Sequence, residues 1–171
     1  MNEPAPRVTR SSPLPPPAAV GMSIEEVDTP ALLLDLDAFE HNLMRLTESL
    51  RGTSVRVRPH AKSHKCPEIA LRQIARGAVG VCCQKVSEAE ALVQGGVGDV
   101  MVANEVVGKQ KLTRLAELAR QARISVCVDD PGNVAQLAQT VRDAGVKQDV
   151  LVEINECANR CGVEPGEPVL S

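Results

Sequence analysis

The sequence predicts an α/β protein with parallel strands, and more specifically part of a (β/α)8 TIM barrel. Short apolar runs alternate with segments of helical periodicity, and the connections between them are short. Most of these runs are apolar along their whole length, which is typical of strands that are buried on both faces. No Gly-x-Gly-x-x-Gly follows any of them, so a barrel is favoured over a dinucleotide-binding sheet.

The first elements are a strand at 31–34 and a helix after it. Asp37 is expected to cap this helix, with Glu40 three residues later. One face of the helix carries Phe39, Leu43, Leu46 and Leu50. About five barrel-type strands are then expected, at 55–58, 79–83, 100–103, 124–128 and 149–155.

Capping signals mark the helices between these strands. They are Pro67 and Gly77 for the first helix, Ser87 with Glu90 as a capping box and Gly95-Gly96 for the second, and Asp130-Pro131 with Gly145 for the last. Residues 1–22 are rich in proline and are expected to form a disordered tail. Residues 23–171 are then the N-terminal part of a barrel, because a complete one takes about 250 residues.

Composition excludes several classes of function. The chain has 171 residues and a net charge of −3, which gives no support for binding nucleic acid or a membrane surface. No apolar stretch approaches the roughly 18 residues of a membrane helix, and no signal peptide is readable. The six cysteines have no disulfide-framework spacing, so we expect reduced cysteines and a cytoplasmic protein.

The segment 58–65 carries the densest cluster of basic side chains, with the sequence RPHAKSHK. It follows the first barrel strand, and the active sites of such barrels lie at the carboxyl ends of the strands. Alternation along an extended strand would place Arg58, His60 and Lys62 on one face. Helices do not bury three cations readily, so we expect this face at the mouth of the barrel.

A lysine at the mouth of a barrel has a specific chemical use. A Schiff base needs a neutral amine, and cationic neighbours together with removal from water favour that form. Arg58, His60 and Lys65 would be such neighbours of Lys62. The residues alone equally allow a solvated basic loop or a phosphate-binding patch.

Three segments carry a family resemblance. RPHAKSHK at 58–65 is very similar to the Arg-Pro-His-x-Lys-Thr-His-Lys motif of D-threonine aldolases and eukaryotic-type D-serine dehydratases, with Ser63 in place of threonine. DTPALLLD at 28–35 and GVCCQKVSEAE at 80–90 resemble the family's first strands. The chain is therefore identified as the N-terminal part of a fold-type III pyridoxal-phosphate (PLP) enzyme, with a barrel like the alanine racemase N-terminal domain.

The resemblance implies roles for particular residues. Lys62 would hold PLP as a Schiff base and then act in proton transfer. His60, beside Lys62 in the motif, and Gln84, just past the next strand, are expected from their positions to bind the cofactor as well. Arg160, in the Arg-x-Gly element at 160–162, would contact the phenolic oxygen of PLP. Glu156-Cys157-Ala158 departs from the glycine-containing stretch that is more usual there. A surface turn is the alternative for Arg160, and a polar loop residue is the alternative for Gln84.

Two further expectations concern other polar residues. Asn104 and Glu105 would line the mouth, or serve only as loop residues or helix caps. Glu153 shares a face with Asn155 and, if that face is inward, could balance the buried charge of Arg58.

The activity implied is that of a PLP-dependent lyase acting on small D-β-hydroxy amino acids, with retro-aldol cleavage of D-threonine to glycine and acetaldehyde. The alternatives are dehydration of D-serine or D-hydroxyaspartate, a non-catalytic PLP-binding protein, and an inactive fragment. The phosphate site and a divalent metal site, for Mn or Zn, are expected only in a full-length homodimer. No metal ligands are assigned here.

Overall fold

The computed structural model describes residues 16, 18–156 and 158–170. Most of the predicted tail at 1–22 therefore lies outside the described residues. The chain divides into two compact units, Met1–Glu40 and His41–Ser171, and each is described by itself.

In the first unit, a short 3-10 helix, η1 (Ile24–Glu26), precedes an extended stretch. The predicted strand at 31–34 is wrong: these residues form no strand, and Leu32 and Leu33 are exposed. Helix α1 (Leu36–Ser49) begins next, and its cap is Asp35, whose Oδ1 accepts a hydrogen bond from the Ala38 backbone at 2.8 Å. The prediction of Asp37 as the cap was wrong by two residues, since Asp37 lies inside the first turn.

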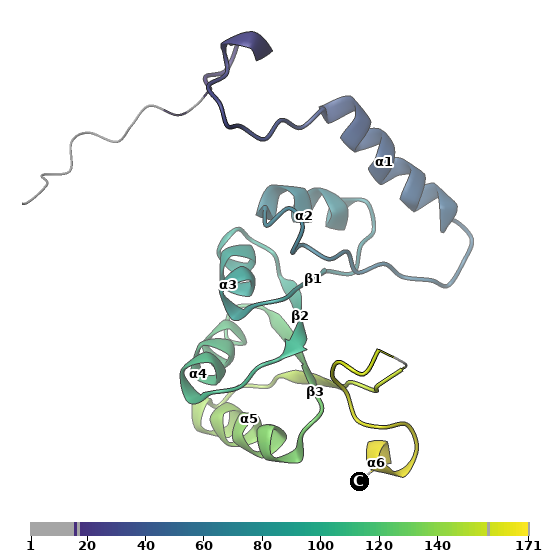
Figure 1. The fold of residues 1–171 in the computed structure, drawn as a ribbon, viewed down its shortest axis with the longest axis vertical. Helices are drawn as coiled ribbons and strands as arrows, with labels where there is room; N and C mark the ends of the chain where they lie inside the picture. Colours follow the sequence, from purple (N-terminus) through teal and green to yellow (C-terminus); the bar gives the residue numbers. More distant parts are fainter. Residues whose placement is uncertain (1–15, 17, 157, 171) are drawn as a thin grey trace, which may run out of the picture. The chain divides into compact units, whose positions relative to one another are not determined.

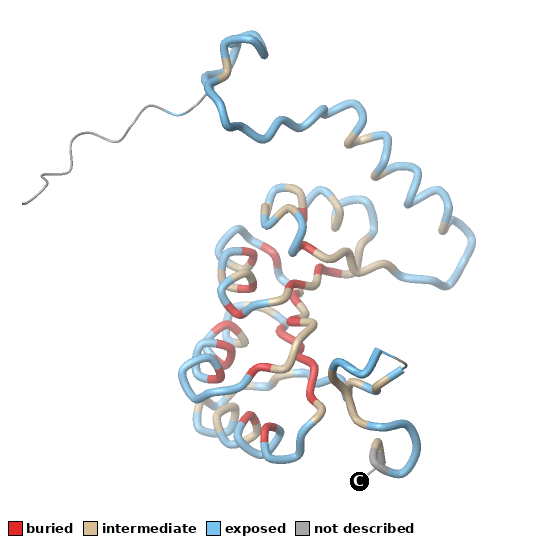
Figure 2. The backbone as a smooth tube through the Cα atoms, viewed as in Figure 1, coloured by how far each residue is buried: buried red, intermediate tan, exposed pale blue. Residues whose placement is uncertain are grey.

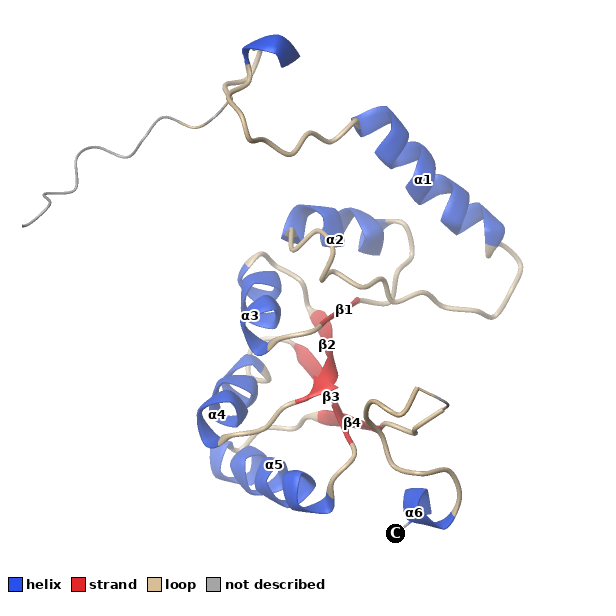
Figure 3. Cartoon of the chain, viewed as in Figure 1, coloured by secondary structure: helices blue, strands red, loops and turns tan. Residues whose placement is uncertain are grey.

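The second unit is built on a four-stranded parallel sheet. The strands are β1 (Val81–Cys83), β2 (Asp99–Glu105), β3 (Arg123–Val128) and β4 (Asp149–Val152), in that spatial order. The helices are α2 (Pro67–Ala75), α3 (Val86–Gln94), α4 (Lys109–Leu118), α5 (Pro131–Ala144) and α6 (Glu167–Leu170). Helices α3, α4 and α5 follow β1, β2 and β3 and cover one face of the sheet (Figures 1 and 3). This arrangement confirms the predicted parallel α/β fold.

The hydrophobic core lies between the sheet and these helices (Figure 2). Val100 and Val102 of β2, Ile124 of β3 and Leu115 of α4 are all at most 1% exposed. Along β2, the alternate residues on the other face are only half-buried, as the pattern of burial shows. In a closed barrel that second face would line the interior. In the described structure no helix covers this face of the sheet, so its side chains are only partly buried.

The expected strand at 55–58 is extended but is not a regular strand. Its backbone still bonds to the β1 segment, from Val79 N to Val57 O at 3.0 Å and from Cys82 N to Pro59 O at 2.8 Å. Proline has no N–H, so Pro59 can accept but cannot donate in a ladder. The expected strand at 55–58 is thus reduced to a single parallel bridge, which joins His60 to Cys82.

Two of the predicted helix signals have opposite outcomes. Asp130 caps α5 as predicted, accepting from Asn133 N at 2.7 Å, and Gly145 ends it in the left-handed conformation at φ 65°. The capping box of Ser87 and Glu90 does not form.

Helix α3 begins two residues earlier than the capping box requires, at Val86. Its third residue is therefore Glu88, and this carboxylate accepts from Gln84 N at 2.9 Å. Glu90 pairs instead with Arg114 of α4.

Five cysteines lie among the described residues, and all five are free thiols, as expected: Cys66, Cys82, Cys83, Cys127 and Cys161. None of the helices in the described part of the chain has both the length and the apolar character needed to cross a membrane.

Candidate functional site

The backbone around Lys62 is anchored to β1. Ala61 N donates to Cys82 O at 2.7 Å, and the Ala61 side chain is 2% exposed. The chain then turns, with Lys65 N bonded to Ala61 O at 2.8 Å and Lys65 in the left-handed region at φ 51°. This turn holds the Lys62 backbone at the carboxyl end of the sheet while its side chain stays exposed.

The two lysines of the motif differ in what their amines contact. Lys65 Nζ lies 3.3 Å from Glu88 Oε1, which ties the end of the motif to the start of α3. Within the described residues, the Lys62 amine has no ion-pair partner. The structure therefore uses Lys65 as an anchor and leaves the Lys62 side chain exposed.

His60 and Cys82 flank the lysine. His60 Nδ1 accepts a hydrogen bond from Lys62 N at 3.2 Å, so its other ring nitrogen, Nε2, is directed elsewhere. Burial raises the pKa of the Cys82 thiol, while the positive charges of Arg58 and Lys62 oppose that shift.

Gln84 lies just past β1, as predicted, and meets residues from the end of β2. Its backbone carbonyl oxygen accepts from Asn104 Nδ2 at 3.4 Å. Gln84, Asn104 and Glu105 line a cavity of about 320 Å³ beside the starts of α3 and α4. The predicted position of all three at this edge of the sheet agrees with the structure; a role in binding a cofactor stays a prediction.

Arg58 does not belong to this edge, which corrects the expectation that it shares a site with Lys62. Arg58 Nη1 lies 2.7 Å from Asp99 Oδ1, at the amino end of β2. Arg123 continues the series, 3.6 Å from Asp99 and 2.8 Å from Asp149. Charges of alternating sign therefore cross the amino ends of the strands, and Asp99, not Glu153, balances Arg58.

The Arg160 loop is fixed by three local features. Gly162 has a φ of 97°, and a Cβ there would lie 2.6 Å from Asn155 N, so only glycine fits. Gly162 N donates to Asp129 Oδ2 at 3.0 Å. Asn155 holds the other side of the loop through Asn159, whose N donates to Asn155 Oδ1 at 3.0 Å. The unusual residues at 156–158 are thus bracketed by Asn155 and Asn159, and Cys157 itself lies outside the described residues.

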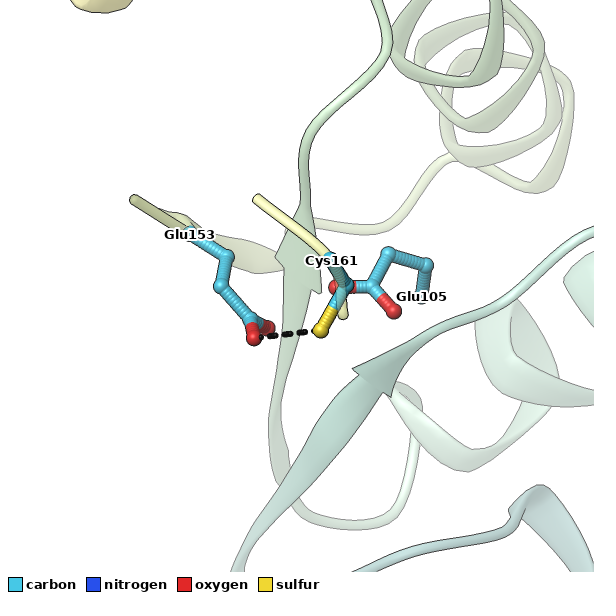
Figure 4. Close-up of side chains that lie close together, drawn as sticks. All are labelled: Glu105, Glu153 and Cys161. Carbon is cyan, nitrogen blue, oxygen red and sulfur yellow. Dashed lines mark hydrogen bonds between the residues drawn. The ribbon is translucent and has the colours of Figure 1, made fainter. Parts of the chain in front are cut away.

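Beside Arg160, three side chains from three segments converge (Figure 4). Cys161 Sγ donates to Glu153 Oε1 at 2.8 Å, and single ligand atoms of Glu105, Glu153 and Cys161 all lie within 4.8 Å of one another. Hydrogen bonds from Cys161 and Glu105 lower the pKa of Glu153, whereas burial and the nearby Glu153 raise the pKa of Glu105. The thiol of Cys161, and the negative charges of Glu153 and Glu105 as well, raise the pKa of Arg160.

Lys62 precedes β1 and Arg160 follows β4, so the two predicted cofactor residues lie at opposite ends of one sheet edge. Sequence reasoning missed the partners that hold them. The sequence shows that these partners, Glu88, Asp129 and Cys161, are polar residues next to a strand end or a motif. Only the parallel register shows which side chain or backbone group each of them contacts.

These features define an α/β-barrel protein with a lysine-bearing site at the carboxyl edge of its parallel sheet. The chain belongs to the alanine racemase N-terminal domain family, whose model matches residues 34–171. It is 52% identical over 164 residues to a D-threonine aldolase of an Arthrobacter species, and 44% identical over 156 residues to a 3-hydroxy-D-aspartate aldolase of Paracoccus denitrificans. These alignments cover 96% and 90% of this chain.

The fold agrees with a solved relative. The crystal structure of D-threonine aldolase from Filomicrobium marinum superposes with a TM-score of 0.89 and 57% identity, covering 92% of this chain. The chain spans 43%, 40% and 42% of the lengths of these three relatives, about two fifths in each case.

Proposed function

We propose that this chain supplies the lysine-bearing part of a PLP-dependent lyase that acts on small D-β-hydroxy amino acids. One observation carries the proposal: Lys62 is held by its backbone at the carboxyl edge of the sheet, while its amine, unlike that of Lys65, has no ion-pair partner among the described residues. Membership of a family that includes aldolases with PLP chemistry supports the choice of cofactor.

The residues present fit PLP at two points. Lys62 offers the free primary amine that a Schiff base needs. Arg160 offers a permanent cation on a loop fixed by Gly162, suited to face the anionic phenolic oxygen. When bound, PLP withdraws electrons from the substrate, which weakens the bonds at the α-carbon.

The chain's own residues then have distinct tasks. Lys62 binds the cofactor and afterwards holds or moves a proton at its Nζ. His60, whose Nδ1 is already engaged with the Lys62 backbone, orients that backbone and presents Nε2. Gln84 would contribute its side-chain amide at the neighbouring strand end, where it lines a cavity with Asn104.

The substrate in this proposal is D-threonine, cleaved to glycine and acetaldehyde, because both D-threonine aldolases are more than half identical to this chain. A divalent metal, Mn or Zn, a homodimeric full-length protein and a cytoplasmic location are further parts of the proposal. Sedimentation of the full-length protein and cell fractionation test the last two.

The first experiment compares Lys62→Ala with Lys65→Ala in protein incubated with PLP. We expect the visible absorbance of lysine-bound PLP to vanish in Lys62→Ala and to persist in Lys65→Ala.

The second experiment incubates full-length protein with D-threonine or D-serine, with and without Mn²⁺. Release of acetaldehyde from D-threonine is expected; pyruvate from D-serine without acetaldehyde from D-threonine would replace the aldolase by a dehydratase, and PLP binding without either product would indicate a carrier.

A further inference from the structure

We propose that Glu88 selects between the two lysines of the segment 58–65: its carboxylate holds the Lys65 amine in an ion pair, so that Lys62 is the lysine that condenses with PLP. Glu88 is thus a positioning residue that acts through Lys65 and touches no reacting atom. The inference rests on the proposed function, because it concerns which amine of this segment takes the cofactor.

The two lysines are chemically equivalent candidates. Both carry a primary amine, both are exposed, and both belong to the same short segment. In the condensation, the unprotonated Nζ of a lysine forms a bond to the aldehyde carbon of PLP, and the aldehyde oxygen leaves as water with the two hydrogens of the amine. Exposure and chemistry therefore leave the choice open, and a neighbouring group must distinguish Lys62 from Lys65.

Glu88 is held in place by α3 and by the turn before this helix. It is the third residue of α3, and its Oε2 accepts a hydrogen bond from Gln84 N at 2.9 Å. Its other oxygen, Oε1, lies 3.3 Å from Lys65 Nζ, and the Glu88 side chain is 12% exposed, whereas that of Lys65 is 62% exposed. A fixed and mostly buried carboxylate therefore holds the end of a long, exposed side chain.

The contacts of Glu88 also keep it charged at neutral pH. Burial acts to raise the pKa of its carboxyl group, but the hydrogen bond from Gln84 N and the ion pair with Lys65 outweigh burial, and the pKa lies below its usual value. The carboxylate thus contacts both the segment that carries Lys62 and the loop that carries Gln84.

The backbone of the segment seats the Lys65 side chain beside α3. The turn is closed by the hydrogen bond from Lys65 N to Ala61 O at 2.8 Å, and Lys65 adopts a φ of 51°. Lys65 and Glu88 line a hollow of about 300 Å³ together with Ala61 and Lys85, whereas Lys62 is not among the described residues that line it. The ion pair therefore places the Lys65 side chain in a hollow that Lys62 does not share.

The ion pair affects reactivity because a paired ammonium group must leave its carboxylate and lose a proton before it can attack the aldehyde. Pairs with one largely exposed partner are individually weak, so the preference that Glu88 adds should be about twofold to fivefold. The alternative is that Glu88 only caps the turn before α3 through Gln84 N. Glu88→Gln separates the two tasks, because the amide oxygen can still accept from Gln84 N, whereas the charge that holds Lys65 is lost.

The first test needs no cofactor and measures acetylation of the two lysines by a limiting amount of acetic anhydride in the full-length protein. Tandem mass spectrometry locates the acetyl groups, and the exposed Lys147, between α5 and β4, serves as the reference amine. Glu88→Gln should raise the rate at Lys65 by about twofold to fivefold and leave the rate at Lys62 unchanged.

The matched control is Glu90→Gln, which removes the same charge from the same helix, where the partner is Arg114. This control should leave the rate at Lys65 unchanged, and Glu88→Asp, which keeps the charge, should restore part of the protection. Equal rates at Lys65 in Glu88→Gln and Glu90→Gln would overturn the proposal, because the ion pair would then not protect the amine.

The second test loads the same full-length variants with PLP and reduces them with borohydride. The ratio of modified Lys65 to modified Lys62 should be about twofold to fivefold higher in Glu88→Gln than in Glu90→Gln. A substitution that only weakens the local structure would lower total modification and leave this ratio unchanged. In Lys65→Arg, which keeps a cation but cannot form a Schiff base, adding Glu88→Gln should not change the amount of modified Lys62.

The outcomes distinguish the selecting role from the proposed function. If Glu88→Gln speeds acetylation of Lys65 but the ratio of trapped PLP equals that in Glu90→Gln, the selecting role is refuted although the proposed function stands. If borohydride traps PLP on neither Lys62 nor Lys65, the proposed function fails and the selecting role fails with it, while the acetylation rates still decide whether Glu88 holds the Lys65 amine.

Discussion

The two ends of the sheet edge hold their site residues by different means. At the β1 end, the backbone beside Lys62 is bonded to a strand whose side chains Val81 and Cys83 are fully buried. At the β4 end, Arg160 follows a strand whose residues Val150 and Leu151 are 49% and 44% exposed, and its loop is fixed by Gly162 and local polar bonds. The position of Lys62 thus depends on the hydrophobic core, and that of Arg160 depends on a local network of hydrogen bonds. A substitution should therefore be able to disturb one position and leave the other unchanged.

The largest effect is expected from the core beneath the β1–β3 half. Leu115→Ala, at a fully buried position of α4, should lower the free energy of unfolding by about 2–5 kcal/mol, because it leaves a cavity against the sheet. Leu151→Ala, on the exposed β4, should cost less than about 1 kcal/mol. Denaturant unfolding followed by circular dichroism measures both. Similar losses would show that β4 is as well packed as the rest.

A second effect should be confined to the β4 end. Gly162→Ala adds a Cβ within 2.6 Å of Asn155 N at a positive φ, which costs about 1–3 kcal/mol of local strain. Hydrogen exchange should accelerate in 153–163 and stay unchanged in 81–128. Acceleration throughout the sheet would mean that the loop is not an independent network.

A smaller effect is expected at the amino ends of the strands. Asp99→Asn removes the partner of the half-buried Arg58 and should cost about 1 kcal/mol, with little dependence on salt. Asp149→Asn breaks an exposed pair with Arg123 and should cost clearly less, an effect that high salt removes. Thermal melts of the two variants at low and high salt make this comparison; equal costs at both salt concentrations would contradict it.

The smallest effect is a pH dependence between α3 and α4. The hydrogen bond from Arg114 lowers the pKa of Glu90, so this pair stabilises the fold above the ordinary glutamate pKa, and the contribution is lost as the pH falls through the lowered value. Glu90→Gln should therefore reduce stability at pH 7 slightly and flatten its decline below about pH 4.5. Melting temperatures at a series of pH values test this. If the decline of stability at low pH is unchanged in Glu90→Gln, other carboxyl groups cause that decline.

The sequence predicts the repeating architecture well because its signals are local. Asp130-Pro131 and Gly145 bound α5 as expected, since capping and a left-handed glycine depend only on nearby backbone. The failures need information from elsewhere in the chain. The apolar run at 31–34 is not a strand, although its composition favours one, and Pro59 interrupts the expected strand at 55–58.

The site divides in the same way. The motif around Lys62 is contiguous, so both its position at a strand end and the anchoring of its backbone could be anticipated. The partners of Glu153 could not, because they depend on the register that places Glu105, Cys127 and Leu151 side by side. Alternation along one strand shows which residues of that strand share a face. It does not show which end of the neighbouring strand they contact, and the prediction therefore paired Arg58 with Glu153 instead of Asp99.

The most direct test of the central claim traps PLP on the protein. Borohydride reduction of the PLP-loaded protein converts a lysine Schiff base into a stable secondary amine, and peptide mapping by mass spectrometry then locates it. We expect one modified lysine, Lys62, with Lys65 unmodified because Glu88 holds its amine. Modification of Lys65 in place of Lys62, or of many lysines equally, would contradict it.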